Sequence, residues 1–437
     1  MVKDFIRIST SLPLKGSCEI SGAKNAVLVI MASSILASGK TTLRNIPVSS
    51  DVLTMIELLE YLGAEVFFDQ EENRLEIDSS TIVQSEVCPD IMSRMRASFL
   101  VMGPLLARFG RAHIALPGGC SLGKRPIDYH LKNFKKMGVT VEEESHFITA
   151  TCQQLQARRL VLEYPSVGAT ENIIMAAVLT SGVTEIVNAS LEPEVDDLIS
   201  VLRKMGANIT TQVPATIIIE GVESLNSVEY SVMPDRLEAG SLLLAAAITG
   251  GEISIPNAQP HIMDVFLLKL EEMGHTVVVS DNGKGIFFKA TTAPKAVSFK
   301  TGPFPGFPTD LQAPMMVAQT LAEGTSIIEE TVFENRLLHI QELRKMGAQI
   351  EQIGTKAIVT GVPHLVGASV VATDIRAACG LVLAGLVAHG KTEMTGVAHF
   401  DRGYDRLTQK LVQLGGKVER FSSEVLGSSS KHIEKFV

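Results

Sequence analysis

The chain has 437 residues, of which 46% are hydrophobic, and a formal net charge of −9. This length predicts two or three domains with a sizeable core, and charges of both signs without a basic tail or stripe argue against nucleic acid as a partner. An acidic total does not exclude an anionic substrate, because nearby Arg and Lys side chains set the local field.

The first residues, MVKDFIRIST, lack the apolar core of a signal peptide, and the longest apolar stretch, residues 27–37, is too short to span a bilayer. We therefore expect a cytoplasmic protein with no membrane partner. The cysteines are odd in number and have no paired spacing, which argues against both a disulfide framework and a zinc site. They are Cys18, Cys88, Cys120, Cys152 and Cys379. We expect no metal and no cofactor, and a free thiol at Cys120.

One phrase recurs six times along the chain, as in LEYLGAEV, LRKMGANI and LRKMGAQI. Its glycines are Gly63, Gly138, Gly206, Gly274, Gly347 and Gly415, which lie 75, 68, 68, 73 and 68 residues apart by subtraction. An apolar spacing typical of a helix precedes each glycine, and a β-like run follows it. Glycine just past the last turn is the expected helix stop.

A second phrase recurs out of phase with the first, as in SGAKNAVLVIMASSILASG, SVGATENIIMAAVLTSG and ATDIRAACGLVLAGLVAHG. Each copy predicts a helix that is apolar nearly all round and therefore buried, followed by a short strand. The repeating unit is a buried helix, a strand, a loop, an amphipathic helix and then one or two strands. Units of this size are too large for the common solenoids but can form compact lobes.

Polar residues interrupt the pattern at two equivalent places. The mouths of the buried helices carry Lys24, Arg96, Thr170, Asp235, Asp310, and Asp374 with Arg376. The loops before the amphipathic helices carry Cys120 with Lys124 and Arg125, Arg336, and Arg402. Equivalent loops emerge on equivalent faces of a repeat, and helix N-termini favour anions, so this pattern predicts an anion-binding cleft.

Each of these residues also has a simpler interpretation. Lys24 taken alone is as well explained by a solvated surface side chain. Asp310 and Asp374 could be helix N-caps, and Arg336 and Arg402 could form surface ion pairs that contribute little. The segment SGKTTL, residues 38–43, resembles the end of a phosphate-binding loop but has Ser34 where that motif needs glycine, and it follows its helix.

The loop LPGGCSLGKRPIDYH, residues 116–130, places Cys120 among glycines beside Lys124 and Arg125. Neighbouring cations lower the pKa of a thiol, so we interpret Cys120 as reactive rather than as an inert buried thiol. A Cys–His nucleophile with His130 fits less well, because acyl chemistry would not need so many cations.

These motifs, together with FPTDLQA, ETVFENRLLHIQELRKMGA and FDRGYDR, resemble the UDP-N-acetylglucosamine 1-carboxyvinyltransferases, a branch of the enolpyruvyl transferase family, from the first residues to about Phe421. The resemblance implies a two-lobed inside-out α/β barrel with three repeats in each lobe. It places the first lobe at residues 23–234 and the second at 1–22 and 235–421. We expect residues 422–437 to form a mobile tail.

The resemblance also implies the reaction. The enolpyruvyl group of phosphoenolpyruvate would pass to the 3′-hydroxyl of UDP-N-acetylglucosamine with release of phosphate, the first committed step of peptidoglycan synthesis. The residues implied in catalysis are Lys24, Cys120, Asp310, Asp374 and Arg402. Those implied in binding phosphoenolpyruvate are Lys24, Asn25, Arg125, Arg336 and Arg402. Those implied in binding the nucleotide sugar are Arg96, Arg125, Pro126, Ile127, Asp128, Tyr129, Tyr164, Pro165, Ser166, Val167, Asp310 and Val332.

Cys120 would add reversibly to phosphoenolpyruvate from a lid loop, and fosfomycin, a phosphonate epoxide, would alkylate it. Two alternatives stay open. A sister enolpyruvyl transferase acts on shikimate 3-phosphate and should lack the Cys120 lid and the RPIDYH segment. A non-catalytic repeat scaffold would not need Lys, Arg, Asp and Cys at matched helix mouths.

Overall fold

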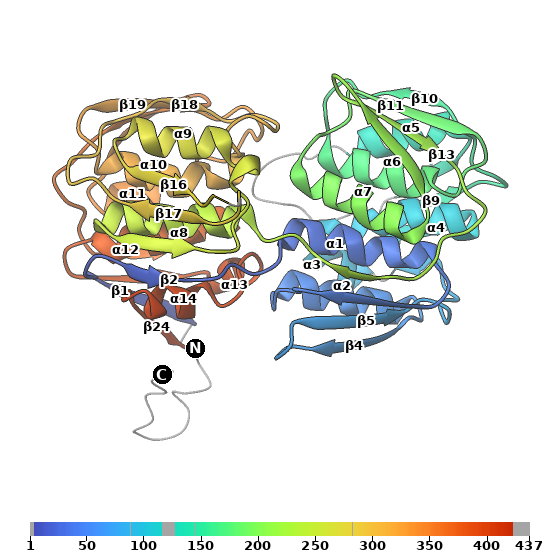
Figure 1. Ribbon diagram of the computed structural model, residues 1–437, viewed down its shortest axis with the longest axis horizontal. Coiled ribbons are helices and arrows are strands. Elements are labelled where there is room, and N and C mark those ends of the chain that lie inside the picture. Colours follow the sequence, from blue (N-terminus) through green and yellow to red (C-terminus); the bar gives the residue numbers. More distant parts are fainter. Residues whose placement is uncertain (1–3, 88, 116–126, 145, 282, 423–437) are drawn as a thin grey trace. The chain divides into compact units, whose positions relative to one another are not determined.

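The computed structural model describes residues 4–87, 89–115, 127–144, 146–281 and 283–422. The chain forms two compact units (Figure 1). The inserted unit comprises the described residues between 22 and 233, and the split unit comprises residues 4–21 and those from 234 onward. The split unit is therefore built from both ends of the described chain.

The inserted unit contains two kinds of helix and short strands. Its helices are α1 (Lys24–Ser33), η1 (Ser34–Leu36), α2 (Ser50–Tyr61), α3 (Pro89–Arg94), η2 (Arg96–Val101), α4 (Met102–Phe109), α5 (Asp128–Lys136), α6 (Val167–Ala177) and α7 (Pro193–Met205), where η marks a 3₁₀ turn. Its strands are β3 (Lys40–Arg44), β4 (Glu65–Asp69), β5 (Arg74–Asp78), β6 (Glu86–Val87), β7 (Arg111–Ala115), β8 (Thr140–Glu143), β9 (Phe147–Thr151), β10 (Arg159–Val161), β11 (Val183–Val187), β12 (Asn208–Gln212), β13 (Thr216–Glu220) and β14 (Glu229–Ser231).

The split unit has the same make-up. Its helices are α8 (Arg236–Thr249), η3 (Pro260–Ile262), α9 (Asp264–Glu272), η4 (Thr309–Leu311), α10 (Gln312–Thr320), α11 (Ile340–Lys345), α12 (Ile375–Val387), α13 (Val397–Asp401) and α14 (Leu407–Gln413). Its strands are β1 (Phe5–Ser9), β2 (Lys15–Ser17), β15 (Glu252–Ile255), β16 (Thr276–Val279), β17 (Ile286–Lys289), β18 (Phe299–Lys300), β19 (Thr325–Glu329), β20 (Gln349–Ile353), β21 (Lys356–Thr360), β22 (Ser369–Val371), β23 (Lys391–Thr395) and β24 (Lys417–Phe421).

Within the described residues the strands form six four-stranded sheets of one topology. In β14-β3-β5-β4, for example, the first pair is parallel and the other two pairs are antiparallel. The orders β22-β23-β1-β24 and β18-β19-β21-β20 follow the same rule. The six repeats expected from the sequence and the two-lobed α/β class are thereby confirmed.

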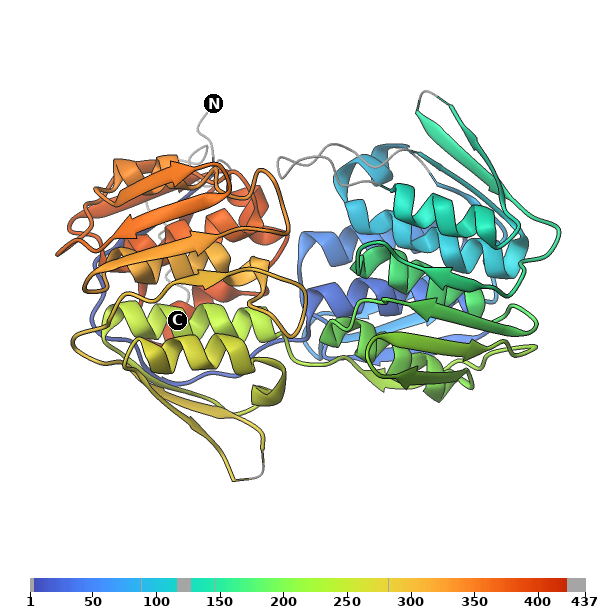
Figure 2. The ribbon, with the colours of Figure 1, turned by 90° about the horizontal axis from the view of Figure 1, so that it is seen from above.

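The helices expected to be buried lie inside each unit. In α8 every residue from Arg236 to Ala247 is buried, and α8, α10 and α12 pack against one another. Strands such as β1 and β5 alternate between buried and partly exposed residues, so one face of each sheet covers the helices. Figure 2 shows the sheets on the outside of each unit with helices between them.

The repeated glycines end the amphipathic helices as expected. All six have positive φ, between 88° at Gly347 and 109° at Gly206, a conformation that side-chain-bearing residues rarely adopt. None of the helices in the described residues is long and apolar enough to cross a membrane.

Two of the expected buried helices begin differently from the sequence pattern. The stretches that open at Arg96 and Thr309 first form the 3₁₀ turns η2 and η4, and the α-helices start only at Met102 and Gln312. Each α-helix carries a proline, Pro104 or Pro314, as its third residue. Proline has no N–H to donate and is tolerated only in the first turn, so its position determines where the α-helix can begin.

In each unit, strands from the ends of its sequence pair with strands of another repeat. β14 follows the third repeat and pairs with β3 of the first, so the inserted unit is closed by its own last strand. β1 lies between β23 and β24, and β2 pairs with β15. Figure 1 shows these N-terminal strands, in blue, beside the red C-terminal elements of the split unit.

Two glycines at equivalent repeat positions leave no space for a side chain. A Cβ at Gly221 would lie 1.7 Å from the carbonyl oxygen of Thr180, and one at Gly361 would lie 1.8 Å from that of Ala322. We expect Gly221→Ala to cost about 2 kcal/mol or more, because a backbone carbonyl cannot move aside as a flexible side chain can. Thermal unfolding should show a melting temperature lower by several degrees.

Gly302→Ala is the matched control, because a Cβ at Gly302 would meet nothing within 4 Å. An unchanged melting temperature in Gly221→Ala would contradict the close approach of the two segments.

Candidate active site

The site in the split unit is centred on Asp310, in the 3₁₀ turn η4. Pro308 precedes the turn, and the first turn of α10 follows it. The Asp310 side chain is 21% exposed and does not cap a helix. Its carboxylate therefore remains available to side chains from other repeats.

Two buried guanidinium groups hold the Asp310 carboxylate. Arg336 Nη2 donates to Oδ1 at 2.7 Å, and Arg376 Nη2 donates to Oδ2 at 2.7 Å. The two arginine side chains are only 3% and 4% exposed. Burial opposes ionisation of Asp310, but the charges of Arg376 and Arg336 outweigh it and hold the pKa of the carboxyl well below its usual range. The surface ion-pair interpretation of Arg336 is wrong, because the residue is buried.

Arg376 lies in the first turn of α12. Asp374 is the N-cap of this helix, and its carboxylate accepts hydrogen bonds from the backbone N–H groups of Arg376 and Ala377. Burial lowers the pKa of Arg376, but the charge of Asp310 has the larger, opposite effect. The net pKa lies above its usual value, so the guanidinium stays charged. Its Nη1 is buried and has no hydrogen-bond partner among the described residues. Asp374 thus positions an arginine with a spare donor.

Glu330 connects the Asp310 turn to the next loop. Its Oε2 accepts from the hydroxyl of Thr309, and its Oε1 accepts from the backbone N–H groups of Val332 and Phe333. The Phe333 ring lies 5.2 Å from the Arg336 guanidinium carbon. Val332, one of the residues implied by the resemblance, is therefore held beside the turn that carries Asp310.

Arg402, the remaining cation of the implied set in this unit, is the C-cap residue of helix α13 and is half-buried. Next to it, Asp401 accepts two hydrogen bonds of 2.7 Å from the exposed Arg420. The split unit thus contains Asp310, Val332, Arg336, Asp374 and Arg402 of the implied set, and Arg376 with them.

In the inserted unit, Lys24 begins helix α1 and is buried. A cation at this end opposes the helix dipole, and the structure shows what offsets it: Lys24 Nζ lies 3.3 Å from Oδ2 of Asp51, in the first turn of α2. The solvated-surface interpretation of Lys24 is wrong. Asn25 follows it with an exposed side chain.

The described residues of the inserted unit that are implied in nucleotide-sugar binding lie at the starts of α5, α6 and η2. Ile127 and Asp128 lie at the start of α5, and the ring of Tyr129 stacks 6.5 Å from that of Tyr164. Ser166 caps α6, and Val167 is its first residue, directly after Pro165. Arg96, half-buried, is the first residue of η2.

Asn172 connects these elements. Its Oδ1 accepts from the Gly103 N–H at 2.6 Å, and its Nδ2 lies 3.0 Å from the Phe99 carbonyl oxygen and 3.1 Å from Nδ1 of His130. Burial, with a smaller contribution from the charge of Arg96, lowers the pKa of His130 to about 3. A neutral imidazole thus accepts from Asn172, and α5 is held to η2 and α6.

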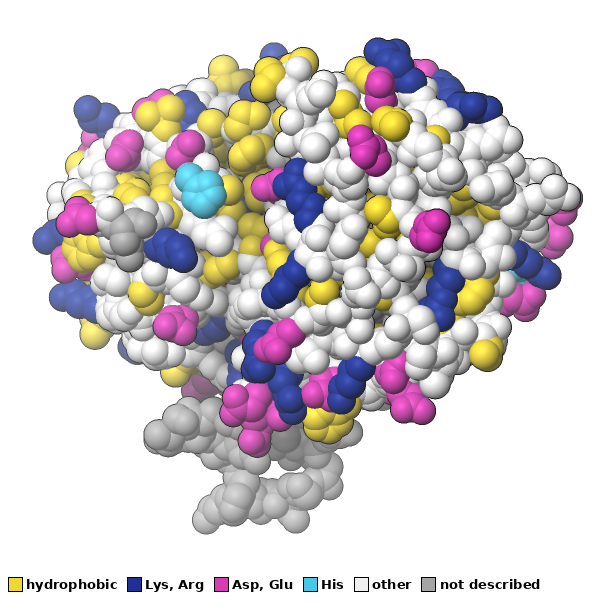
Figure 3. Space-filling model, turned by 45° about the vertical axis from the view of Figure 1, so that its right-hand side comes forward, with side chains coloured by type: hydrophobic (Ala, Val, Ile, Leu, Met, Phe, Trp, Pro, Cys, Tyr) yellow, Lys and Arg dark blue, Asp and Glu magenta, His cyan; other side chains and the backbone are white. Residues whose placement is uncertain are grey.

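Three of the implied residues, Cys120, Arg125 and Pro126, lie outside the described residues, as does Lys124. Among the described residues, no group of three or more His, Cys, Asp or Glu side chains could hold a metal ion. On the face shown in Figure 3, Lys and Arg side chains are interspersed with Asp and Glu.

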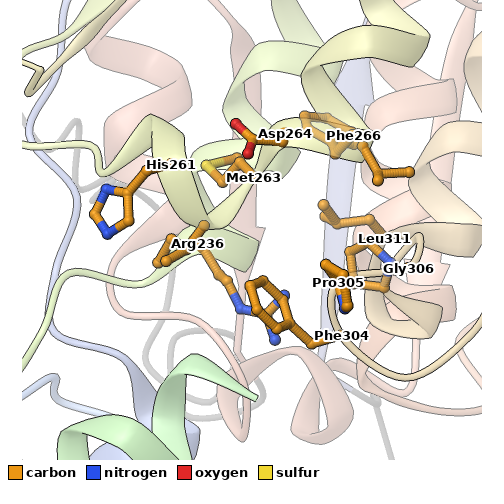
Figure 4. Close-up of a pocket in the computed structure, with 12 residues that line it drawn as sticks. Arg236, His261, Met263, Asp264, Phe266, Phe304, Pro305, Gly306 and Leu311 are labelled. Atoms are coloured by element: carbon orange, nitrogen blue, oxygen red, sulfur yellow. The ribbon is translucent and has the colours of Figure 1, made fainter. Parts of the chain in front are cut away.

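A small pocket lies beside the Asp310 turn, lined partly by Pro308 and Leu311. Figure 4 shows Arg236 extending toward Phe304, whose ring centroid is 5.9 Å from the guanidinium carbon. The pocket has a volume of about 30 Å³, enough for one or two water molecules but not for a substrate. The pocket is therefore too small to be the substrate-binding site.

The sequence pattern did not assign a role to three residues of this site. Arg376 was noted at a helix mouth, but only the structure shows it on Asp310. Asp51 and Glu330 follow no repeated motif, and an Asp in a first helical turn or a Glu at a strand end has ordinary structural explanations. Only a three-dimensional structure reveals that they hold Lys24 and Thr309.

His339 is a buried histidine close to the charges of Arg336 and Asp374. It precedes α11 by one residue and is 2% exposed. Burial lowers its pKa to about 4, the charge of Asp374 partly opposes this, and that of Arg336 adds to it. The imidazole is therefore neutral at pH 7.

Comparison with known proteins places these observations in a wider context. A family model described as EPSP synthase (3-phosphoshikimate 1-carboxyvinyltransferase) matches residues 8–411. UDP-N-acetylglucosamine 1-carboxyvinyltransferase 1 of Caldanaerobacter subterraneus subsp. tengcongensis is 48% identical over 414 residues, covering 94% of this chain and 98% of that protein. UDP-N-acetylglucosamine 1-carboxyvinyltransferase of Desulfosudis oleivorans is 46% identical over 417 residues, covering 95% and 99%.

Solved structures show the same fold. The enolpyruvyl transferase NikO from Streptomyces tendae has a TM-score of 0.88 and 26% identity, covering 96% of this chain and 99% of that one. EPSP synthase from Acinetobacter baumannii has a TM-score of 0.76 and 18% identity, covering 96% and 100%. At this lower identity the likeness concerns the fold alone.

The lowered pKa of His339 makes stability depend on pH. Between about pH 6.5 and 4 the unfolded chain binds a proton at this position and the folded chain does not, so stability falls as pH decreases. By pH 5 the free energy of unfolding has fallen by about 2 kcal/mol at most through this residue. We expect the melting temperature of His339→Gln to fall less than that of the wild type between pH 7.5 and pH 5.

His261→Gln removes an exposed histidine of the same unit and serves as the control. Equal falls for the wild type and His339→Gln would show that the imidazole is not kept neutral by the fold.

Proposed function

The chain belongs to the EPSP synthase (3-phosphoshikimate 1-carboxyvinyltransferase) family of enolpyruvyl transferases, and we propose that it transfers the enolpyruvyl group of phosphoenolpyruvate to the 3′-hydroxyl of UDP-N-acetylglucosamine. Phosphate is the second product. The observation that carries this acceptor is identity of 46–48% over nearly the whole chain to proteins named for that reaction. In a bacterium this is the first committed step of peptidoglycan synthesis.

The reaction consists of an addition and an elimination. The sugar oxygen forms a bond to C2 of phosphoenolpyruvate while a proton adds to C3 and the hydroxyl loses its own proton. The tetrahedral product then loses the C3 proton and breaks the C2–O bond to phosphate. Both steps need proton transfer and stabilisation of negative charge, which carboxylate, guanidinium and ammonium groups supply.

The cations suit the substrate phosphoenolpyruvate. Arg336 and Arg402, with Lys24, Asn25 and Arg125, would bind its phosphate and carboxylate, because planar guanidinium groups bind both in bidentate fashion. The spare Nη1 of Arg376 adds a further donor to this set. The nucleotide sugar would contact Arg96, the segment 125–129 and the segment 164–167, with Val332 beside the sugar.

Asp310 would be the base at the sugar hydroxyl, although two guanidinium groups hold its pKa far below neutral. A carboxylate in that state is a weak base. An anion that shares Arg336 and Arg376 would weaken their hold on Asp310, so its pKa would rise when phosphoenolpyruvate binds. The base would thus become effective only when the second substrate is present, with Asp374 supporting it through Arg376.

Cys120 would be the thiol that adds reversibly to phosphoenolpyruvate, helped by Lys124 and Arg125. The C2–S bond would form as C3 takes a proton, and both changes reverse when the adduct collapses.

Of the alternatives, transfer to shikimate 3-phosphate is favoured only by the description of the family model. The relatives that match at 46–48% identity carry the nucleotide-sugar name instead. The scaffold alternative does not explain why two buried arginines share a single carboxylate, an arrangement that is costly unless it serves a purpose.

Replacing Asp310 by Asn should lower kcat about 100-fold or more, because the base is lost and both arginines lose their counter-charge. The measurement is phosphate release from phosphoenolpyruvate with UDP-N-acetylglucosamine and, in parallel, with shikimate 3-phosphate. We expect release by the wild type with the nucleotide sugar only.

Asp264→Asn, an exposed carboxylate at the start of α9, is the matched control and should keep full activity. Release with shikimate 3-phosphate instead would overturn the acceptor. Full activity in Asp310→Asn would remove this carboxylate from the mechanism.

Fosfomycin should inactivate the wild type by opening of its epoxide at the Cys120 sulfur, and Cys120→Asp should resist it. Mass spectrometry of the inactivated protein should show one adduct, on the peptide that contains Cys120. Cys152, a half-buried free thiol, is the internal control and should remain unmodified. Complete inactivation with an unmodified Cys120 would be incompatible with the proposal.

A further inference from the structure

The segment FDRGYDR, residues 400–406, contains a tyrosine that the proposed reaction does not use. Gly403 lies so close to helix α12 that a Cβ would come 2.1 Å from Cγ2 of Ile375. The missing side chain therefore lets the segment pack against the start of α12, where Arg376 lies. The next residue, Tyr404, is 5% exposed.

Several contacts orient the Tyr404 ring, and its hydroxyl also lies within hydrogen-bonding reach of Cys379 and of the Arg376 side chain. The Arg376 guanidinium carbon lies 5.2 Å from its ring centroid, and the ring of Phe400 lies 5.5 Å away on a tilted plane. The Tyr404 hydroxyl is 3.3 Å from Oγ of Ser241. Because Ser241 already donates its proton to the Leu237 carbonyl at 2.8 Å, the hydrogen of this bond comes from Tyr404.

The Tyr404 side chain thus contacts three helices. Its hydroxyl is anchored on α8, its ring packs beside Phe400 of α13, and it contacts the guanidinium of α12 that donates to Asp310 at 2.7 Å. Burial raises the pKa of Tyr404, so the hydroxyl stays protonated and keeps donating. A cation near an aromatic ring is attracted to the ring's face, and more strongly where water is excluded.

We propose that Tyr404 is a positioning residue that holds the Arg376 guanidinium at the angle at which Nη2 reaches Asp310 and Nη1 is left for the anionic substrate. This inference rests on the proposed function for the identity of the substrate, phosphoenolpyruvate. Tyr404 acts through Arg376 and does not itself touch the reacting atoms.

The competing explanation is that Tyr404 only fills the core. Both explanations predict a loss of stability when the ring is removed, so stability alone cannot separate them. They differ in kinetics, because a positioning role affects the use of phosphoenolpyruvate specifically and depends on Arg376.

The experiment uses the full chain with Tyr404→Leu, Tyr404→Phe and Phe288→Leu. Phe288 is a fully buried aromatic residue of the same unit, in β17, and is the matched control for loss of a core ring. We expect Tyr404→Leu to lower kcat/KM for phosphoenolpyruvate about tenfold while KM for the nucleotide sugar changes less than about twofold. Tyr404→Phe keeps the ring and should restore kcat/KM to within about threefold of wild type.

A double-mutant cycle with Arg376→Lys tests whether Tyr404 acts through Arg376. With the planar guanidinium gone, Tyr404→Leu should change kcat/KM by less than about twofold, because neighbours that act together are not additive. A full tenfold effect in the Arg376→Lys background would overturn the inference. So would an equal loss of kcat/KM for both substrates, or the same kinetic change in Phe288→Leu.

A binding measurement separates failure of this inference from failure of the proposed function. If the wild type releases phosphate with neither acceptor, the variants are compared by calorimetric titration with phosphoenolpyruvate alone. Weaker binding in Tyr404→Leu but not in Phe288→Leu would then support the positioning role. Equal binding by all variants, or none by the wild type, would contradict it.

Discussion

One carboxylate that accepts hydrogen bonds from two guanidinium groups joins three segments of the split unit. Asp310 comes from a 3₁₀ turn, Arg336 from the loop before α11, and Arg376 from the first turn of α12. The two arginines are almost fully buried, so loss of the carboxylate would leave charges that water cannot solvate. The shared carboxylate also keeps two buried cations close together, although their charges repel each other. A preformed pair of guanidinium groups of this kind is the arrangement that the proposed binding of phosphoenolpyruvate requires.

Asp310 does not cap a helix, and the position of a single proline explains why. In the neighbouring repeats the matching residues, Asp235 and Asp374, are helix N-caps whose carboxylates accept backbone N–H groups. Pro314 shifts the start of α10 to Gln312, and the residues before it form a 3₁₀ turn. The carboxylate of Asp310 therefore does not accept the backbone N–H groups of a helix start. The repeat thus determines where Asp310 lies, and a local break in the repeat leaves its carboxylate to the two arginines.

Much of the architecture could be predicted because it depends on local pattern. The glycine stops and apolar helices specify six repeats, and the structure confirms the α/β class. The charged side chains were harder to interpret. N-capping was a correct alternative for Asp374 but not for Asp310, and exposure was wrong for Lys24 and Arg336. Capping and burial depend on where a helix begins and on partners such as Asp51, far away in sequence. The roles at Cys120 and Arg125 stay predictions.

The central place of β1 in its sheet has a consequence for biosynthesis. This strand pairs with β23 on one side and with β24 on the other, and those partners are made much later than β1. During translation β1 therefore stays unpaired until β23 and β24 have left the ribosome, whereas the inserted unit contains all the strands of its own sheets. Nascent-chain folding should then run out of linear order, with the inserted unit complete while the split unit still lacks its last sheet.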